Sequence, residues 1–208
     1  MKILALELSS GRGSLAWLDD EEEIFARSFP NDRKHSGLFF ENLQSCLQRA
    51  GSPDAIVVGL GPGSYAGVRI AIAAAVGLRA ASRARLAGIP SICAIETAAC
   101  EYCVIGDARR GSFFFGRVRD GRIVEGPSLH SPDELEIKIM EASGPLFASE
   151  PLPQFPKATV AYPSARRLAE LARAQAGEIA DTLSLEPIYL REPHITVPKA
   201  PHMTTIVR

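Results

Sequence analysis

One segment constrains the fold of this chain more than the others: residues 59–78, GLGPGSYAGVRIAIAAAVGL. From 66 to 81 its only charged side chains are Arg69 and Arg79, so a helix formed here is apolar on every face. One sheet covers only one face of such a helix. The Leu- and Phe-rich stretch 36–50 is a candidate second helix to pack beside it. Because these two helices together still leave apolar surface, the sequence predicts a partner subunit, with complete burial inside one chain as the alternative.

The elements around this segment occur in an order that repeats along the chain. Three short apolar runs joined by tight turns predict antiparallel strands, and they are followed by a helix, a buried strand and a second helix. In the first unit these elements are expected at 3–8, 13–18, 22–29, 36–50, 55–60 and 66–81, with a further short strand at 84–91 and a small helix at 94–99. In the second unit they are expected at 102–109, 111–120, 122–126, 131–143, 144–149 and 162–177.

The repeated order predicts an α/β protein with two similar lobes, each with a mixed sheet and flanking helices. This architecture resembles the actin-like ATPase (ribonuclease H-like) fold. We expect an N-terminal lobe at 1–100 that carries the dimerisation helices, a C-terminal lobe at 101–191, and an extended or mobile tail at 192–208. The tail contains three prolines and has no helical period.

Composition narrows the function classes. The chain has 208 residues, 46% hydrophobic content and a net charge of -1, which disfavours direct, unaided binding to nucleic acid. Its longest uninterrupted apolar stretch, 70–78, is too short for a membrane span, and the N-terminus lacks a signal-peptide pattern, so a cytoplasmic protein without membrane contact is expected. Cys100 and Cys103 have the spacing of a redox pair or of half a zinc site, but no second ligand pair accompanies them, so half-buried thiols are expected and no metal site is predicted.

The glycine-rich turn has two interpretations. It lies between a predicted strand and a predicted helix, where free amide groups and the helix dipole favour an anion. It lacks the Lys-Ser/Thr pair of a Walker loop, and a dinucleotide-binding module is disfavoured because the unit begins with antiparallel strands. The other interpretation is a tight turn that lets the strand and the helix pack closely. The candidate anion- or nucleotide-binding set is Glu7, Ser9, Ser10, Gly61, Gly63 and Ser64.

Several blocks together carry a family resemblance. ILALELSS, KHSGLFF, VVGLGPGSYAGVRIAIAAAVGL, IGDARRGSFFFG and PIYLR occur in the order seen in the bacterial TsaB (YeaZ) family, over almost the whole chain through Arg191. The chain therefore resembles a noncatalytic relative of TsaD that takes part in making threonylcarbamoyladenosine on tRNA. The family usually has Asp at the position of Glu7. The extra methylene of Glu moves the carboxylate and disturbs the octahedral geometry that magnesium requires.

The resemblance implies a scaffold without catalytic residues. It implies a homodimer in isolation, a heterodimer with a TsaD-like catalytic subunit, a TsaE-like ATPase as a third component, and tRNA contact only through the complex. No intrinsic cofactor is expected, while ATP or ADP at the complex interface stays open. A small actin-like ATP-binding enzyme, a kinase or a protease, is the alternative. The expected interface residues are His35, Leu38, Phe39, Leu43, Cys46, Tyr65, Val68, Arg69, Ile72, Ala73 and Val76.

The residues next to each polar side chain in the sequence indicate its expected role. Ser36 is expected to cap a helix, and His35 to cap or to lie at the interface, because no acid is adjacent to orient it as a base. Arg69, a lone charge in its apolar stretch, is expected to pair with an acid on this chain or on the partner. Asp107 is expected to accept hydrogen bonds from amides of its turn. The arginines near 79–85 and 109–110 are expected to be solvated, with tRNA contact in the complex as the alternative.

Overall fold

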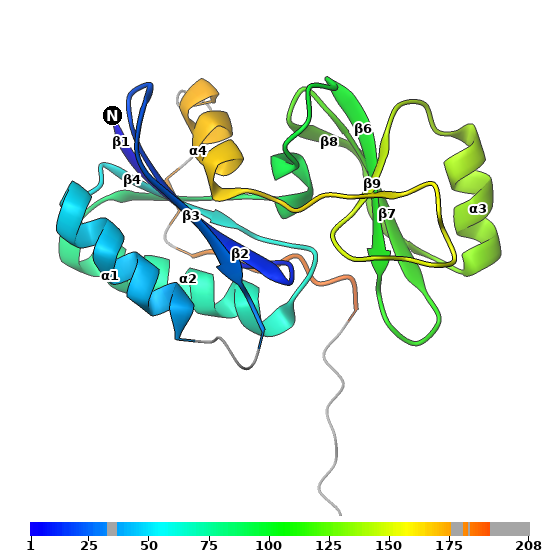
Figure 1. Ribbon diagram of the computed structural model, residues 1–208, viewed down its shortest axis with the longest axis horizontal. Helices are drawn as coiled ribbons and strands as arrows, with labels where there is room; N and C mark the ends of the chain where they lie inside the picture. The colour runs from blue at the N-terminus through cyan, green and yellow to red at the C-terminus, as the bar shows by residue number, and fades with distance from the viewer. Residues whose placement is uncertain (33–36, 176–180, 183, 192–208) are drawn as a thin grey trace, which may run out of the picture.

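The computed structural model describes residues 1–32, 37–175, 181–182 and 184–191. In these residues the chain forms two lobes that lie side by side, each built on a five-stranded sheet (Figure 1). The first sheet has the strand order β3-β2-β1-β4-β5 and the second has the order β10-β9-β6-β7-β8. Two similar mixed sheets with flanking helices confirm the predicted fold class.

The first sheet follows the predicted pattern. β1 pairs antiparallel with β2, and β2 with β3, because their connections are too short for a crossover. β1 pairs parallel with β4, and β4 with β5, across helical connections. The strands are β1 (Lys2–Glu7), β2 (Arg12–Asp19), β3 (Glu22–Pro30), β4 (Ala55–Gly59) and β5 (Arg85–Ile89).

The second sheet repeats this arrangement. β6, β7 and β8 form an antiparallel meander, and β9 pairs parallel with β6. The strands are β6 (Glu101–Asp107), β7 (Phe113–Arg119), β8 (Arg122–His130), β9 (Leu146–Ala148) and β10 (Thr159–Val160). Strand β8 continues four residues beyond the predicted end at 126, and the two-residue strand β10 was not predicted because so short a run has no readable period.

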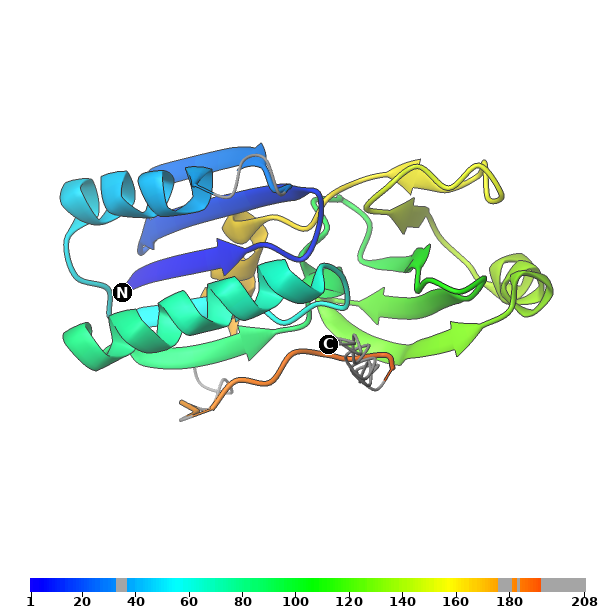
Figure 2. The same ribbon diagram turned by 90° about the horizontal axis from the view of Figure 1, so that it is seen from below.

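The helices are α1 (Leu38–Ala50), α2 (Tyr65–Ser82), α3 (Pro132–Glu141) and α4 (Ala165–Ala174), with a 3₁₀ turn η1 (Ser91–Ala94). α1 and α2 lie side by side on one face of the first sheet, and α4 lies on the opposite face (Figures 1 and 2). α3 lies at the outer side of the second lobe (Figure 1). Ser131 begins α3 with a capping box to Glu134, as its sequence predicts.

Three expectations about the helices differ from the structure. The small helix expected at 94–99 is instead the 3₁₀ turn η1 at 91–94, because Pro90 fixes the backbone just before it. α1 begins at Leu38 with Gly37 as its N-cap, and the predicted cap Ser36 lies outside the described residues. α4 was assigned to the C-terminal lobe but packs on β1, β2 and β4 of the first sheet. The first lobe is therefore built from residues that precede the second lobe in the sequence and from α4, which follows it. The expected tail 192–208 lies outside the described residues.

This return of α4 explains why β1 and β4 are apolar on both faces. Leu4 and Leu6 of β1 face the cluster shared with α1 and α2. Ile3 and Ala5, on the opposite face, belong to the cluster that includes α4 and the core of the second lobe. Both faces of these central strands are therefore buried, and apolar residues lie on both faces. A strand with one face in water would instead alternate apolar and polar residues.

Helix α2 lies very close to the turn that follows β1. Gly67 is buried in the first turns of α2, and a Cβ there would overlap the carbonyl oxygen of Leu8. Ser64 caps the helix by accepting the amide of Gly67 at 3.2 Å, and the amide of Ser64 donates to the carbonyl oxygen of Ser9 at 2.6 Å. Glycine at 67 therefore sets the distance between α2 and the first sheet.

Two glycines of the same helix give a matched test of this packing. Gly67→Ala should lower the free energy of unfolding by about 2 kcal/mol, because the new methyl group meets backbone that cannot move aside. Gly77→Ala meets no atom within 4 Å and should raise it by about 0.5–1 kcal/mol through helix propensity alone. Urea denaturation at concentrations where the chain is monomeric measures both; equal effects of the two changes would contradict the packing argument.

Candidate functional site

The outer side of α2 is an exposed apolar surface. Four residues of the helix are buried against the chain itself, namely Gly67, Val68, Ala71 and Ala75. The opposite side repeats every three or four residues with small or aliphatic side chains, and Ile70 and Val76 are 38% and 44% exposed. We call this line of residues the α2 face. Its exposed members are Ala66, Ile70, Ala73, Val76, Gly77 and Ala80.

The neighbouring helix α1 adds one large apolar side chain to the exposed surface. Phe40 is 55% exposed, while Phe39, in contact with it at a ring-centroid distance of 4.9 Å, is buried. A soluble chain gains free energy by covering such groups, because each exposed apolar Å² costs about 25 cal/mol. The α2 face together with Phe40 is therefore the strongest candidate for a docking surface in the described residues.

Several expected interface residues do not lie on this surface. Phe39, Leu43, Cys46 and Val68 are buried under α1 and α2 in the first lobe's own core, because these positions point to the sheet, so they offer nothing to a partner. Leu38 and Ile72 are half-buried. His35 lies outside the described residues. Of the expected residues, Tyr65, Arg69, Ala73 and Val76 are exposed.

α2 is also the one helix among the described residues that is long and apolar enough to cross a membrane. It has 18 residues with a mean hydropathy of 1.2, and 22% of them are buried. A single such helix is weak evidence for a membrane span, since an apolar helix of a soluble protein has the same length and composition. Because its inner side packs on β1, β4 and β5, α2 is part of the first lobe's helix layer.

The two turns of the candidate anion-binding set lie together. Residues 7–10 follow β1, residues 61–64 precede α2, and the amide of Ser64 donates to Ser9. Two more of their amides have protein acceptors: Ser9 donates to Glu7 at 2.6 Å, and Gly61 donates to the Ser91 hydroxyl at 2.9 Å. Of the six residues in the set, Gly63 is exposed, Ser64 is half-buried and the other four are buried. This geometry fits the close-packing interpretation of the turn better than the anion-binding one.

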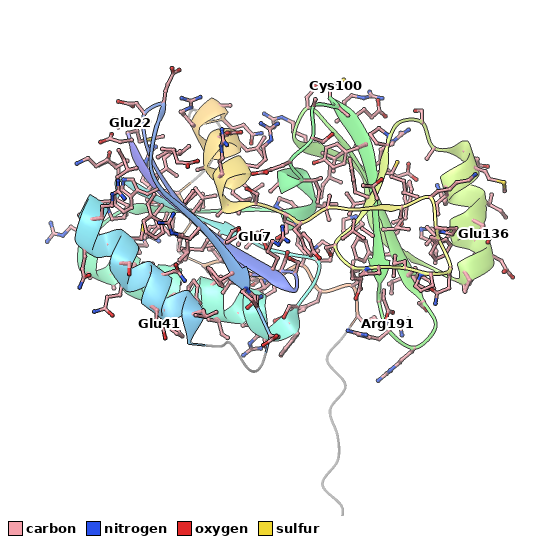
Figure 3. All side chains as sticks on the ribbon, viewed as in Figure 1. Glu7, Glu22, Glu41, Cys100, Glu136 and Arg191 are labelled. Atoms are coloured by element: carbon pink, nitrogen blue, oxygen red, sulfur yellow. The ribbon has the colours of Figure 1, made fainter. Side chains whose placement is uncertain are left out.

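Glu7 is fully enclosed by protein. Its Oε1 accepts the amide of Ser9, its Oε2 has no hydrogen-bond partner, and a Cβ at Gly59 would overlap Oε2. Figure 3 places Glu7 at the end of β1 nearest the second lobe, in contrast to Glu22, Glu41 and Glu136 at the periphery. Burial raises the pKa of the Glu7 carboxyl, and hydrogen bonding to Ser9 and Ser91 offsets part of that rise.

Other expected polar residues have local partners. Asp107 accepts the amide of Arg109 at 2.6 Å and pairs with its guanidinium at 3.2 Å, which confirms the turn-acceptor prediction. Arg79, expected to be solvated, instead pairs with Asp181 at 3.1 Å. The cysteines are free, with Cys100 exposed and the others buried. Within the described residues, His, Cys, Asp and Glu form no group of three that could hold a metal ion.

One contact was missed by the sequence reasoning. Arg69 was expected to pair with an acid, but its guanidinium lies 5.1 Å from the Tyr65 ring centroid and donates to the Tyr65 hydroxyl at 2.6 Å. Tyr189 stacks on Tyr65 with a ring-centroid distance of 5.4 Å. The i, i+4 spacing of Tyr65 and Arg69 could have indicated the first contact. Nothing local indicates Tyr189, which is more than a hundred residues away in the chain.

Comparison with known proteins decides the family. Residues 30–141 match the model of the family described as TsaD, tRNA N6-adenosine threonylcarbamoyltransferase, over more than half of the chain. The chain belongs to the TsaD family. Its fold is that of the family's YeaZ (TsaB) members, an actin-like, ribonuclease H-like fold, as the sequence resemblance implies.

Known proteins similar to this chain include two solved structures and a curated relative. An uncharacterized protein with similarity to peptidase YeaZ, from Pseudomonas aeruginosa, is 26% identical with a TM-score of 0.75, covering 91% of this chain and 99% of that one. YeaZ from Pseudomonas aeruginosa is 21% identical with a TM-score of 0.71, covering 90% and 100%, and shows the fold alone. The uncharacterized protein ML0378 of Mycobacterium leprae is 36% identical over 84 residues, which are 40% of this chain and 23% of that protein. This chain thus matches about a quarter of the length of its curated relative.

The enclosed carboxyl gives a pH-dependence test. A raised pKa means that folded Glu7 keeps its proton above its ordinary pKa of 4.5, where the unfolded chain releases it. The free energy of unfolding should therefore fall as pH rises above 4.5, by up to about 1.4 kcal/mol per pH unit until folded Glu7 ionises. Glu7→Gln removes this slope, so its stability relative to the wild type should increase with pH.

Urea denaturation between pH 4 and pH 8 measures this difference. Glu22→Gln, at the exposed end of β3, is the control and should leave the wild-type profile unchanged. Parallel profiles for the wild type and Glu7→Gln would show that Glu7 ionises in the folded chain as readily as in the unfolded one.

Proposed function

We propose that this chain is a noncatalytic scaffold subunit of the tRNA threonylcarbamoyladenosine machinery. It binds a TsaD-like catalytic subunit and so supports threonylcarbamoyl transfer to the adenosine beside the anticodon in tRNAs that read ANN codons. The observation that carries the proposal is the exposed α2 face, with Ile70 and Val76 open to solvent, and the exposed Phe40 on the neighbouring helix α1. Family membership and the YeaZ-like fold supply the reaction context.

The proposed partners use this face in turn. Alone, the chain pairs with a second copy; in the complex, the TsaD-like subunit replaces that copy, because one apolar surface serves one partner at a time. A TsaE-like ATPase completes the assembly, and tRNA is reached only through the complex. The chain has no intrinsic cofactor in this proposal, and ATP or ADP at the complex interface is left to experiment. Its net charge of -1 fits a protein that does not hold tRNA by itself.

The state of the two candidate turns supports docking over catalysis. The amides of Ser9, Gly61 and Ser64 all donate to protein acceptors, so they are not free to hold a phosphate. The Glu7 carboxyl faces serines and glycine backbone.

One observation favours the alternative, a small ATP-binding kinase or protease: both turns come together at the end of β1. Tight magnesium–nucleotide binding by the isolated chain in calorimetry, with turnover, would establish that alternative.

Ala73→Glu tests the docking face directly. Ala73 is exposed in the middle of α2, whereas its neighbour Ala74 packs partly on the core, so the change places a charge on the face with little effect on folding. Binding of a TsaD-like subunit from the same organism should weaken at least about a hundredfold, because a buried unpaired carboxylate costs several kcal/mol. Self-association in analytical ultracentrifugation should also be lost.

Ala98→Glu, on an exposed part of the linker between the lobes, is the matched control and should bind like the wild type. Undiminished binding by Ala73→Glu in calorimetry would exclude the α2 face as the docking surface.

Reconstitution tests the scaffold role itself. The chain, a TsaD-like subunit, a TsaE-like ATPase, threonylcarbamoyl-adenylate and tRNA are mixed, and each component is omitted in turn while modified adenosine is measured by mass spectrometry. Omission of this chain should abolish modification, and this chain with tRNA and adenylate alone should give none. Modification without this chain, or by this chain alone, would contradict a noncatalytic scaffold.

A further inference from the structure

The C-terminal segment, residues 181–182 and 184–191, is bound along the edge of the first sheet. Thr182 donates its amide to Leu86 of β5 at 2.9 Å, and the Asp181 carboxylate accepts the Leu86 amide at 2.8 Å. Arg79 of α2 reaches both the Asp181 carboxylate and the Thr182 carbonyl oxygen. Further on, Ile188 donates to Leu60 at 2.8 Å. The segment, orange in Figure 2, runs along the sheet edge toward the second lobe.

This course brings Tyr189 to the beginning of α2. Its ring stacks on Tyr65, and Tyr65 and Tyr189 are 51% and 42% exposed. The Arg69 guanidinium packs over the Tyr65 ring. Hydrogen bonding to Tyr189 first, and then the interaction with Tyr65, raises the pKa of Arg69, so the group stays cationic. We call Tyr65, Arg69 and Tyr189 the aromatic–arginine cluster.

Arg69 has no acidic partner among the residues that the structure describes. Its contacts there are the two tyrosines, although it is the only charged side chain in the first three turns of α2. The Tyr65 ring and the hydrogen bonds to Tyr65 and Tyr189 hold the guanidinium in place, so a partner group meets it with little loss of side-chain entropy. Tyrosine and arginine are also the residue types that most often dominate binding energy at protein interfaces.

On the basis of the proposed function, we infer that the aromatic–arginine cluster extends the α2 face and receives a carboxylate of the TsaD-like partner. The C-terminal segment then has a defined role, because it supplies Tyr189 to the interface. Ile70 and Ala66, exposed on the same helix, join the cluster to the α2 face. The interface would consist of an apolar stripe with a charge-specific contact at one end.

The charges favour a different protein over a second copy of this chain. α2 contains no acidic residue, and α1 contains only Glu41. A second copy docked α2 against α2 therefore brings Arg69 no carboxylate from that helix and adds more arginines. RNA is disfavoured because one arginine among exposed aliphatic side chains lacks the repeated cations that phosphate binding requires.

The test measures binding of the full-length chain to the TsaD-like subunit by calorimetry at two salt concentrations. Arg69→Met and Tyr189→Ala should each raise Kd at least about tenfold. Tyr189→Phe, which keeps the ring, should bind within about threefold of the wild type, and Arg69→Met should show a weaker salt dependence. Arg83→Met, which removes an exposed arginine just after α2, is the charge-matched control and should bind like the wild type.

Two further measurements separate the possible outcomes. Self-association by ultracentrifugation should be unchanged in Arg69→Met; a loss equal to the loss of partner binding would identify a second copy as the occupant and overturn the inference. Binding of tRNA that is lost in Arg69→Met would overturn it in favour of RNA. If Ala73→Glu abolishes partner binding while Arg69→Met and Tyr189→Ala bind normally, the proposed function stands and this inference fails. If the wild type binds no TsaD-like subunit, both fail.

Discussion

Helix α2 has more apolar surface than its own sheet can cover. Only the side that carries Gly67, Val68, Ala71 and Ala75 is buried. The helix cannot turn another side to the sheet, because only a glycine fits against the carbonyl oxygen of Leu8. Its orientation is therefore fixed, and the same aliphatic side chains, including Val76, always face solvent or a partner. An exposed stripe of this kind is typical of a protein that works in a complex.

The same close contact changes the meaning of the glycine-rich turn. In many α/β proteins a turn between a strand and a helix leaves its amides free for an anion. Here Gly61 and Ser64 donate their amides to Ser91 and Ser9, and the Glu7 carboxyl is buried against Ser9 and Ser91. The residues that hold α2 against β1 are thus the residues that an anion would need. Packing and phosphate binding would need the same amide donors, and in this structure the amides of Gly61 and Ser64 are used in packing.

Much of the architecture was predictable because local signals agree with one another. The meander β1–β3, the buried strand β4 and the capping box of α3 were each expected, since tight turns, apolar runs and a Ser-Pro-Asp-Glu start are read over a few residues. The interface side of α1 and α2 was less predictable. In the all-apolar helix α2 the periodicity does not say which side meets the sheet, so Val68 was predicted at the interface although it lies inward. Phe39 of α1 was also predicted at the interface and is buried against the first lobe.

By itself, the sequence determined the duplicated α/β order, the surplus of apolar surface at α2 and the family resemblance, because each depends on residue type and spacing along the chain. Only the tertiary structure decided which side of α2 is exposed, that α4 packs on the first sheet, and that Tyr189 joins Tyr65 and Arg69. These arrangements depend on contacts between residues far apart in the chain. These contacts depend on how the two lobes, α4 and the C-terminal segment pack against one another. No local sequence pattern encodes this packing.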